Sequence, residues 1–240
     1  MKVLGLILGT LCLAGQAAAS DLPKAPADVV ALATSWSGFY FGATAGWYQS
    51  RRQTVTFSTS DAPGTLGPSA GPAAPTSFAS TGTVGGIHLG YNWQFAPRFL
   101  LGFEADRDFA STRGHGASFN VSTVGAIPFA SDTDQVLPWF GTVRARLGFL
   151  PTEHLLIYGT GGFAYGRIDQ DATYTNMSEF NSLSSSNGIC NNLSVCYRGS
   201  KSRNADGWAA GGGMEYALPN HWTIRAEYLY VKLGGADSFD

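Results

Sequence analysis

Seven stretches of this chain repeat one pattern, in which apolar and often aromatic side chains alternate with Gly, small or charged side chains. In the first stretch, Phe39, Phe41 and Trp47 alternate with Gly42 and Gly46. A period of two is the period of an extended strand, whose successive side chains point to opposite faces. The pattern therefore predicts strands at residues 39–48, 83–94, 99–108, 137–149, 155–165, 207–218 and 222–230.

The polarity of the two faces indicates where these strands lie. In the third stretch, Phe99, Leu101 and Phe103 alternate with Glu104 and Asp106 on the opposite face. A water-soluble sandwich would turn its charges outward, whereas a barrel with lipid outside and a polar lumen inside turns them inward. The sequence predicts an all-β protein: an antiparallel up-and-down transmembrane β-barrel of the eight-strand class, with seven strands evident.

The connections between the predicted strands alternate between long and short. Short turns contain Pro97, Pro151 and Pro219, and long connections follow the first, third and fifth strands. Barrels of the bacterial outer membrane have short periplasmic turns and long extracellular loops. The predicted extracellular loops are 49–82, 110–135 and 169–204.

Aromatic residues gather beside the short turns. Trp93, Phe95, Phe149, Tyr216 and Trp222 all lie there. Aromatic rings are enriched where the hydrocarbon meets the polar headgroups. We therefore predict that these five residues form an aromatic girdle at the periplasmic interface.

The amino-terminal segment has the features of a secretory signal. Lys2 precedes a short apolar run, and Ala17, Ala18 and Ala19 provide a small-residue cleavage site. The alternative is a retained helical anchor, but the apolar run is shorter than the roughly 20 residues that a bilayer requires. The predicted organisation is a signal peptide at 1–19, a disordered periplasmic lead-in at 20–35 and an outer-membrane barrel at 36–240.

Composition excludes two other classes of protein. After the signal there is no long apolar run and the chain is 44% hydrophobic, so it is not a helical membrane protein. The formal net charge of −2 gives no indication of nucleic-acid binding, and no basic patch of the density that such binding requires is present, so no nucleic-acid partner is expected.

Cys190 and Cys196 lie in a Ser- and Asn-rich stretch of an exported chain, where a disulfide is predicted over two free thiols. Such a bridge would close a short loop and stabilise the protein by about 2 kcal/mol on the chain-entropy account. No His is near in sequence to complete a metal site, so no metal is expected.

The inward-facing charges are the candidate site. Buried charges must be paired or hydrated, so the acidic and basic side chains are expected to face one another across a narrow lumen as a structural salt-bridge network. A proton or ion path through the same groups is the alternative. The residues of this predicted lumen charge network are Glu104, Asp106, Arg144, Arg146, Glu215, Arg225 and Glu227.

An enzymatic function has little support in the sequence. A hydrolase needs a nucleophile beside a base, whereas the four His residues, His88, His115, His154 and His221, are scattered over a strand, an outer loop and two turns. The Gly clusters lie within strands and not on a strand-to-helix turn, so they do not cradle a phosphate. No catalytic residue and no cofactor is expected.

Several short motifs together resemble a known family. They are Trp36–Gly42, Gly86–Asn92, Gly102–Asp106, Thr142–Gly148, Tyr158–Gly166 and Arg225–Leu233. In order and spacing they are similar to the small porin-like outer-membrane β-barrels related to the outer-membrane immunogenic proteins of Gram-negative bacteria. The resemblance implies an eight-stranded, surface-exposed, antigenic barrel in the outer membrane, with structural, weak-pore or ligand-binding roles, and it supplies no catalytic residues.

The chain departs from that family at its carboxyl end. Members end on an eighth strand with a terminal aromatic residue, whereas this chain stops at Gly234–Asp240. An open sheet leaves backbone groups unpaired, and each one in hydrocarbon costs several kcal/mol. We therefore expect a C-terminally truncated form of an eight-stranded barrel. The alternative is that the seventh strand pairs directly with the first.

The favoured function is that of a structural and surface-interaction protein whose long loops face the environment. The competing hypothesis is a small ion-conducting pore lined by Arg144, Arg146 and Arg225. A soluble ligand-binding barrel would need the opposite parity. The expected partners are outer-membrane lipid and lipopolysaccharide, the barrel-insertion machinery, and surface ligands bound by the three loops.

Overall fold

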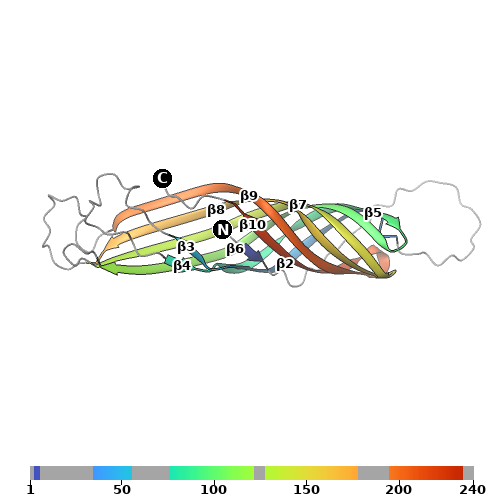
Figure 1. Ribbon diagram of the computed structural model, residues 1–240, viewed down its shortest axis with the longest axis horizontal. Helices are drawn as coiled ribbons and strands as arrows, with labels where there is room; N and C mark the ends of the chain where they lie inside the picture. Colours follow the sequence, from blue (N-terminus) through green and yellow to red (C-terminus); the bar gives the residue numbers. More distant parts are fainter. Residues whose placement is uncertain (1–2, 6–34, 56–75, 122–127, 178–194, 235–240) are drawn as a thin grey trace, which may run out of the picture.

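The computed structural model describes residues 3–5, 35–55, 76–121, 128–177 and 195–234. These residues form an elongated barrel of tilted antiparallel strands (Figure 1). No helix in the described part of the chain is long and apolar enough to cross a membrane. The long strands are β2 (Gly38–Ser50), β5 (Thr81–Ala96), β6 (Phe99–Val121), β7 (Pro128–Thr152), β8 (Leu155–Asn176), β9 (Val195–Ala217) and β10 (Thr223–Leu233).

Each long strand pairs with the next long strand along the chain. The order around the barrel is β10, β9, β8, β7, β6, β5 and β2, and every pair is antiparallel. Short turns join β5 to β6 and β7 to β8, and the 3₁₀ turn η3 (Pro219–His221) joins β9 to β10. The predicted fold class, an up-and-down barrel of the eight-strand class, is confirmed.

A three-residue strand occupies the eighth place in the ring. β1 (Val3–Gly5) pairs with Leu229–Val231 of β10 on one side, and its Val3 and Leu4 pair with the end of β2 on the other. In the described residues, β10 forms ladders only with β9 and β1, and β2 only with β5 and β1. The two edges of the seven-stranded sheet are thus joined through β1 and not by direct pairing.

The inverted polarity predicted from the alternation is confirmed. On the outer surface, Phe39 is 67% exposed and Phe103 is 61% exposed, whereas Leu100 and Leu156 on the inner face are 0% exposed. Large apolar rings on the outside are stable only against hydrocarbon. The strands therefore present a lipid-facing surface and enclose a packed interior.

The strands are longer than predicted at the end opposite the short turns. Figure 1 shows β6, β7, β8 and β9 continuing past the other strands at this end. The predicted loop 110–135 is wrong over most of its length, because β6 and β7 pair there, for example Gly116 with Thr133. The predicted loop 169–204 is wrong for the same reason, since β8 and β9 pair there.

The physical reason for these errors is that the outer portions of the strands leave the lipid. Neither face needs to be apolar there, so the hydrophobic alternation disappears although the backbone ladder continues. Part of the predicted loop 49–82 is also strand: β3 (Gln53–Val55) pairs with β4 (Thr76–Phe78), and β5 begins at Thr81.

One side chain in the membrane part has the opposite parity from the prediction. The alternation places Leu137 outward, whereas it is buried in the interior at 2% exposure. The ladder between β7 and β8 shifts register between Val136 and Trp139. An irregularity of this kind adds a residue to one strand and inverts the parity beyond it.

β4 lies on the inner face of the outer extension of β6. A Cβ atom at Gly116 would collide with the side chains of Thr76 and Phe78, and one at Gly114 would collide with that of Ser80. Thr76 donates a hydrogen bond to Ser118 on β6 over 2.8 Å. Glycine on β6 therefore provides the space in which β4 packs inside the outer end of the barrel.

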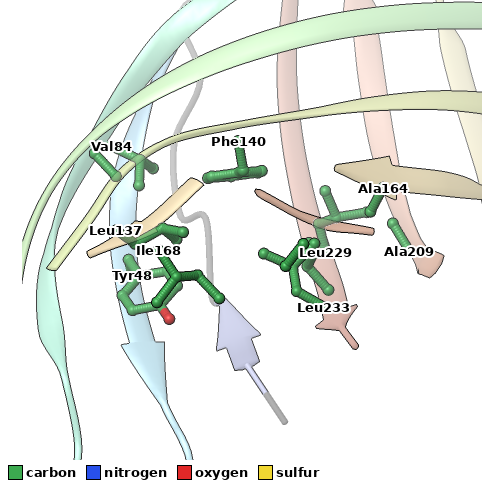
Figure 2. Close-up of a cluster of buried hydrophobic side chains, with 12 residues drawn as sticks. Tyr48, Val84, Leu137, Phe140, Ala164, Ile168, Ala209, Leu229 and Leu233 are labelled. Carbon is green, nitrogen blue, oxygen red and sulfur yellow. The ribbon is translucent and has the colours of Figure 1, made fainter. Parts of the chain in front are cut away.

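Two buried apolar clusters divide the interior into levels. The periplasmic cluster is Trp36, Leu100, Leu150, Leu156, Tyr158 and Ala217. The outer cluster, most of which is labelled in Figure 2, is Tyr48, Val84, Ala110, Leu137, Phe140, Ala164, Ile168, Ala205, Ala209, Leu229, Val231 and Leu233. Along β7, Leu150 belongs to the first cluster and Phe140 to the second, and two arginines lie between them.

Candidate functional site

A layer of buried charges crosses the barrel between the two apolar clusters. It contains all seven residues of the predicted lumen network, and their exposure ranges from 2% for Arg146 to 8% for Glu227. β6, β7, β9 and β10 supply these side chains from positions of inward parity. We call this set the charged layer: Glu104, Asp106, Arg144, Arg146, Glu215, Arg225 and Glu227.

Arg144 on β7 pairs with three carboxylates. Its Nη2 atom lies 2.8 Å from Glu104 and 2.9 Å from Asp106, both on the neighbouring strand β6. Its Nη1 atom lies 2.5 Å from Glu227 on β10. One guanidinium group thus joins carboxylates from two separate strands, which makes good use of its fixed fork of donors.

Arg225 on β10 spans the lumen. Its Nη1 atom donates to Glu104 on β6 over 2.7 Å, and its Nη2 atom lies 3.3 Å from Glu215 on β9. In the ring, β10 and β6 are separated by β9, β8 and β7. A contact between strands so far apart in the sheet can form only across the interior.

Arg146 lies one inward position closer to the periplasmic cluster. Its Nε atom donates to the amide oxygen of Asn92 over 2.9 Å, and its Nη1 atom lies 3.3 Å from Glu215. The guanidinium carbon is 4.7 Å from the ring centre of Tyr40 and 5.0 Å from that of Tyr158. The same Nη1 atom lies 3.7 Å from Glu104, so Arg146 is held by two carboxylates, an amide and two aromatic faces.

The two tyrosines complete the layer and were not among the predicted site residues. Tyr40 donates to Glu104 over 2.7 Å, and Tyr158 donates to Glu227 over 2.5 Å. A Cβ atom at Gly90 would collide with the Tyr40 ring, so this glycine makes room for it. The sequence could have identified both tyrosines, because positions 40 and 158 have inward parity. A phenol that faces a carboxylate in the lumen donates a hydrogen bond to it.

Asp106 is fixed by three groups. Besides Arg144, it accepts hydrogen bonds from the hydroxyl of Thr142 and, over 3.0 Å, from the Thr142 backbone N–H. Thr142 lies directly opposite Asp106 in the β6–β7 ladder. The register of the two strands therefore brings donor and acceptor together.

The buried charges do not balance. Among the described residues, five buried carboxylates, the fifth being Asp108, face three buried guanidinium groups. Asp108 accepts a hydrogen bond from Thr44 over 2.6 Å, and no described cation lies within 4.0 Å of it. Beside it is a cavity of about 20 Å³, whose lining includes Thr44, His88 and Asp108. That volume suits about one water molecule.

The histidines are not brought together. His88 is buried in the interior, His115 lies outside on β6 with its Nδ1 atom 3.1 Å from Asp134, and His154 and His221 lie at the short turns. The described residues contain no group of three or more His, Cys, Asp or Glu that could hold a metal ion. The chemistry available to the site is charge pairing across the lumen.

The five residues of the predicted girdle lie on the outer surface near the short turns. Their exposure ranges from 39% for Trp222 to 58% for Trp93. Trp93 contacts Phe95 at 6.0 Å between ring centres, and Phe149 contacts Phe99 at 5.5 Å. This is the geometry of rings lying side by side along an interface.

The predicted disulfide cannot be placed, because Cys190 lies outside the described residues. The bridge between Cys190 and Cys196 stays a prediction. The signal peptide at 1–19 stays one too, since only Val3–Gly5 of that segment is described.

Comparison with known proteins decides the family. A family model described as "outer membrane protein beta-barrel domain" matches residues 5–240. The chain belongs to this family. The 31 kDa outer-membrane immunogenic proteins of Brucella melitensis biotype 1 and Brucella suis biovar 1 are each 34% identical to it, over 98% of this chain and 86% of theirs. The 22 kDa outer membrane protein of Rhizobium leguminosarum bv. viciae is 25% identical over 91% of this chain and 72% of its own.

No solved structure matches the chain. The family and these relatives nonetheless confirm two predictions, the resemblance to the immunogenic outer-membrane barrels and the location in the outer membrane. The names of these relatives describe outer-membrane proteins and not enzymes.

Proposed function

We propose that this protein is a non-conducting outer-membrane barrel whose interior is closed by side chains and whose extended strands carry a surface for interactions outside the cell. The pairing of Arg225 with Glu104 over 2.7 Å carries the proposal, because it joins opposite sides of the lumen. The apolar clusters above and below add two further barriers. Charged side chains locked in pairs between apolar layers leave no continuous hydrated path.

The outer extension of β6–β9 supports the second part of the proposal. Barrel strands need about ten residues to cross a bilayer, whereas β7 has 25 and β9 has 23. Polar groups such as His115 and Asp134 lie on the outer face of this extension. The extension would provide the contact surface for surface ligands.

Export and assembly complete the proposal. A signal peptide at 1–19 would direct the chain across the inner membrane, and its cleavage would remove β1 from the eighth place in the ring. The barrel-insertion machinery would place the barrel among lipid and lipopolysaccharide. The predicted disulfide between Cys190 and Cys196 would form during export in an oxidising compartment.

The second candidate is a small ion-conducting pore. The cavity of about 20 Å³ beside Asp108 favours it, because a hydrated space within a charged layer is a step toward a path for ions. A pore would need further openings through both apolar clusters.

Planar-bilayer recordings of the full chain separate the two functions. The closed barrel gives no discrete openings, and Arg167→Ala, an exposed arginine outside the lumen, is equally silent. Regular openings of the unmodified protein, with a selectivity that changes in Arg144→Ala, would establish the pore and refute the closed interior.

The orientation of the proposed surface is tested on intact cells. In a background with Cys190 and Cys196 replaced by Ser, Ala117→Cys on the exposed face of the β6 extension should react with a membrane-impermeant maleimide. Glu153→Cys at a short turn is the matched control and should stay unlabelled until the cells are broken. The reverse labelling pattern would contradict the proposal.

A further inference from the structure

Arg107 is a charged side chain on the lipid-facing surface. It lies on β6 with the same outward parity as Phe103 and Phe109, each 61% exposed. A strand rises about 3.4 Å per residue and tilts by roughly 40°, which places Arg107 roughly 20 Å above Phe99 at the periplasmic end. Since the lipid-facing band of such barrels is about 25 Å tall, Arg107 lies just inside its outer boundary.

Aromatic rings hold the Arg107 guanidinium in place. Its central carbon is 4.4 Å from the ring centre of Trp139 and 5.8 Å from that of Phe109. In the described part of the chain, no carboxylate lies within 4.0 Å of it, whereas the neighbouring outward arginine, Arg167, donates to Asp169 over 2.9 Å. A charge at the edge of the membrane is stabilised by an anionic partner, and an anion from outside the protein would supply one to Arg107.

An apolar groove begins directly below Arg107. Its volume is about 400 Å³, and its lining includes Phe41, Ile87, Leu89, Ala105 and Arg107. Arg107 lies opposite Ile87 in the ladder, and Ala105 lies opposite Leu89 one step closer to the centre of the membrane. The small side chain of Ala105 leaves the recess, and the larger ones form its walls.

The order of these features along the barrel matches that of a lipid molecule. The cation lies at the headgroup level and the apolar groove extends from it toward the membrane centre. We propose that Arg107 and this groove bind one lipid A molecule of the outer leaflet, with a phosphate on the guanidinium and an acyl chain in the groove. Arginine suits this role because its planar fork of donors matches phosphate oxygens. The site depends on the outer-membrane location and not on whether the lumen conducts.

Native mass spectrometry of the full chain with bisphosphorylated lipid A tests the site. Arg107→Gln should weaken binding roughly fivefold, the contribution of about one basic residue near an anionic membrane surface. Ala105→Leu, which fills the groove without touching the charge, should weaken binding of the same lipid. Arg107→Lys keeps the charge but loses the planar fork, and should retain part of the affinity.

Arg167→Gln is the matched control, since it removes an outward arginine that already has a carboxylate partner. It should bind lipid A as the unmodified protein does. Equal losses in Arg107→Gln and Arg167→Gln would overturn the site. Equal affinity for dephosphorylated lipid A would overturn the role of the phosphate, and equal affinity for phosphatidylglycerol would overturn the assignment to lipid A. The three altered side chains, Ala105, Arg107 and Arg167, all point outward from the barrel, so every variant is expected to run as a folded barrel in electrophoresis without heating.

Discussion

Replacing Arg144 with Met tests how strongly the charged layer holds the barrel. Methionine keeps an unbranched apolar stem but removes the three ion pairs to Glu104, Asp106 and Glu227. Five buried carboxylates would then face two arginines instead of three. Arg144 is 4% exposed, so water cannot replace the lost partner easily.

The three carboxylates that pair with Arg144 differ in the cations that remain near them after the substitution. Glu104 keeps Arg225 at 2.7 Å, and Glu227 keeps Arg225 at 4.0 Å. Asp106 loses the one cation within 4.0 Å of it in the described residues and keeps only Thr142. Removing one partner of a buried ion pair costs about 3–5 kcal/mol, which is a large share of the roughly 5–15 kcal/mol by which ordinary domains are stable.

Urea unfolding in lipid vesicles, followed by tryptophan fluorescence, measures the effect. We expect Arg144→Met to lower the free energy of unfolding by about 3–5 kcal/mol and Arg167→Met, whose ion pair is exposed, to lower it by at most about 1 kcal/mol. Adding Asp106→Asn to Arg144→Met should restore part of the loss, because the amide replaces the one carboxylate that loses its only described cation within 4.0 Å. A loss in Arg144→Met no larger than that in Arg167→Met would refute the reasoning.

Three further predictions have defined outcomes. Gly116→Val should displace β4 and destabilise the outer end by about 1–3 kcal/mol, seen as faster hydrogen exchange there, whereas Gly161→Ala, with 3.7 Å of space, should not. Tyr158→Phe should lower the free energy of unfolding by about 1.5–3 kcal/mol, because it leaves a buried carboxylate oxygen without its donor. Cys190 and Cys196 should resist alkylation in envelope protein until a reductant is added, and immediate labelling of both would exclude the bridge.

The inward charges could be found from sequence because parity alone determines which face a side chain occupies. Glu104, Arg144 and Arg225 lie at positions of the same parity as small residues in their strands, and no other information was needed to group them. The specific partners could not be deduced, because they depend on which strands lie opposite each other across the lumen. β6 and β10 come into contact because the sheet closes into a ring. The alternation within one strand carries no information about how the ring closes.

The apolar alternation could not reveal two other features of the fold. Leu137 lies past an irregularity in the β7–β8 ladder, and a parity count continues through such a site without detecting it. The outer halves of β6–β9 lack apolar contrast because water surrounds them, so they resembled loops. Apolar periodicity reports the solvent on each face, and it fails where both faces meet water.

The charged layer and its hydrogen-bond partners together include a side chain from every long strand. The contributors are Tyr40 from β2, Asn92 from β5, Glu104 from β6, Arg144 from β7, Tyr158 from β8, Glu215 from β9 and Arg225 from β10. A slip of one residue in any ladder turns all side chains of that strand to the other face. For the strands that carry a charge, this would move a carboxylate or guanidinium group into hydrocarbon, at a cost of about 2–4 kcal/mol for Arg or Lys at the midplane and less for an acid.

The apolar clusters cannot discriminate between the correct strand register and a shifted one in this way. A leucine such as Leu156 or Leu229 is stable against lipid as well as against the packed interior, so its transfer to the outer face changes the free energy little. Buried ion pairs add little net stability, because desolvation offsets most of their attraction. We infer that the charged layer mainly specifies which register the barrel adopts, and that the apolar clusters on either side of it fill the lumen.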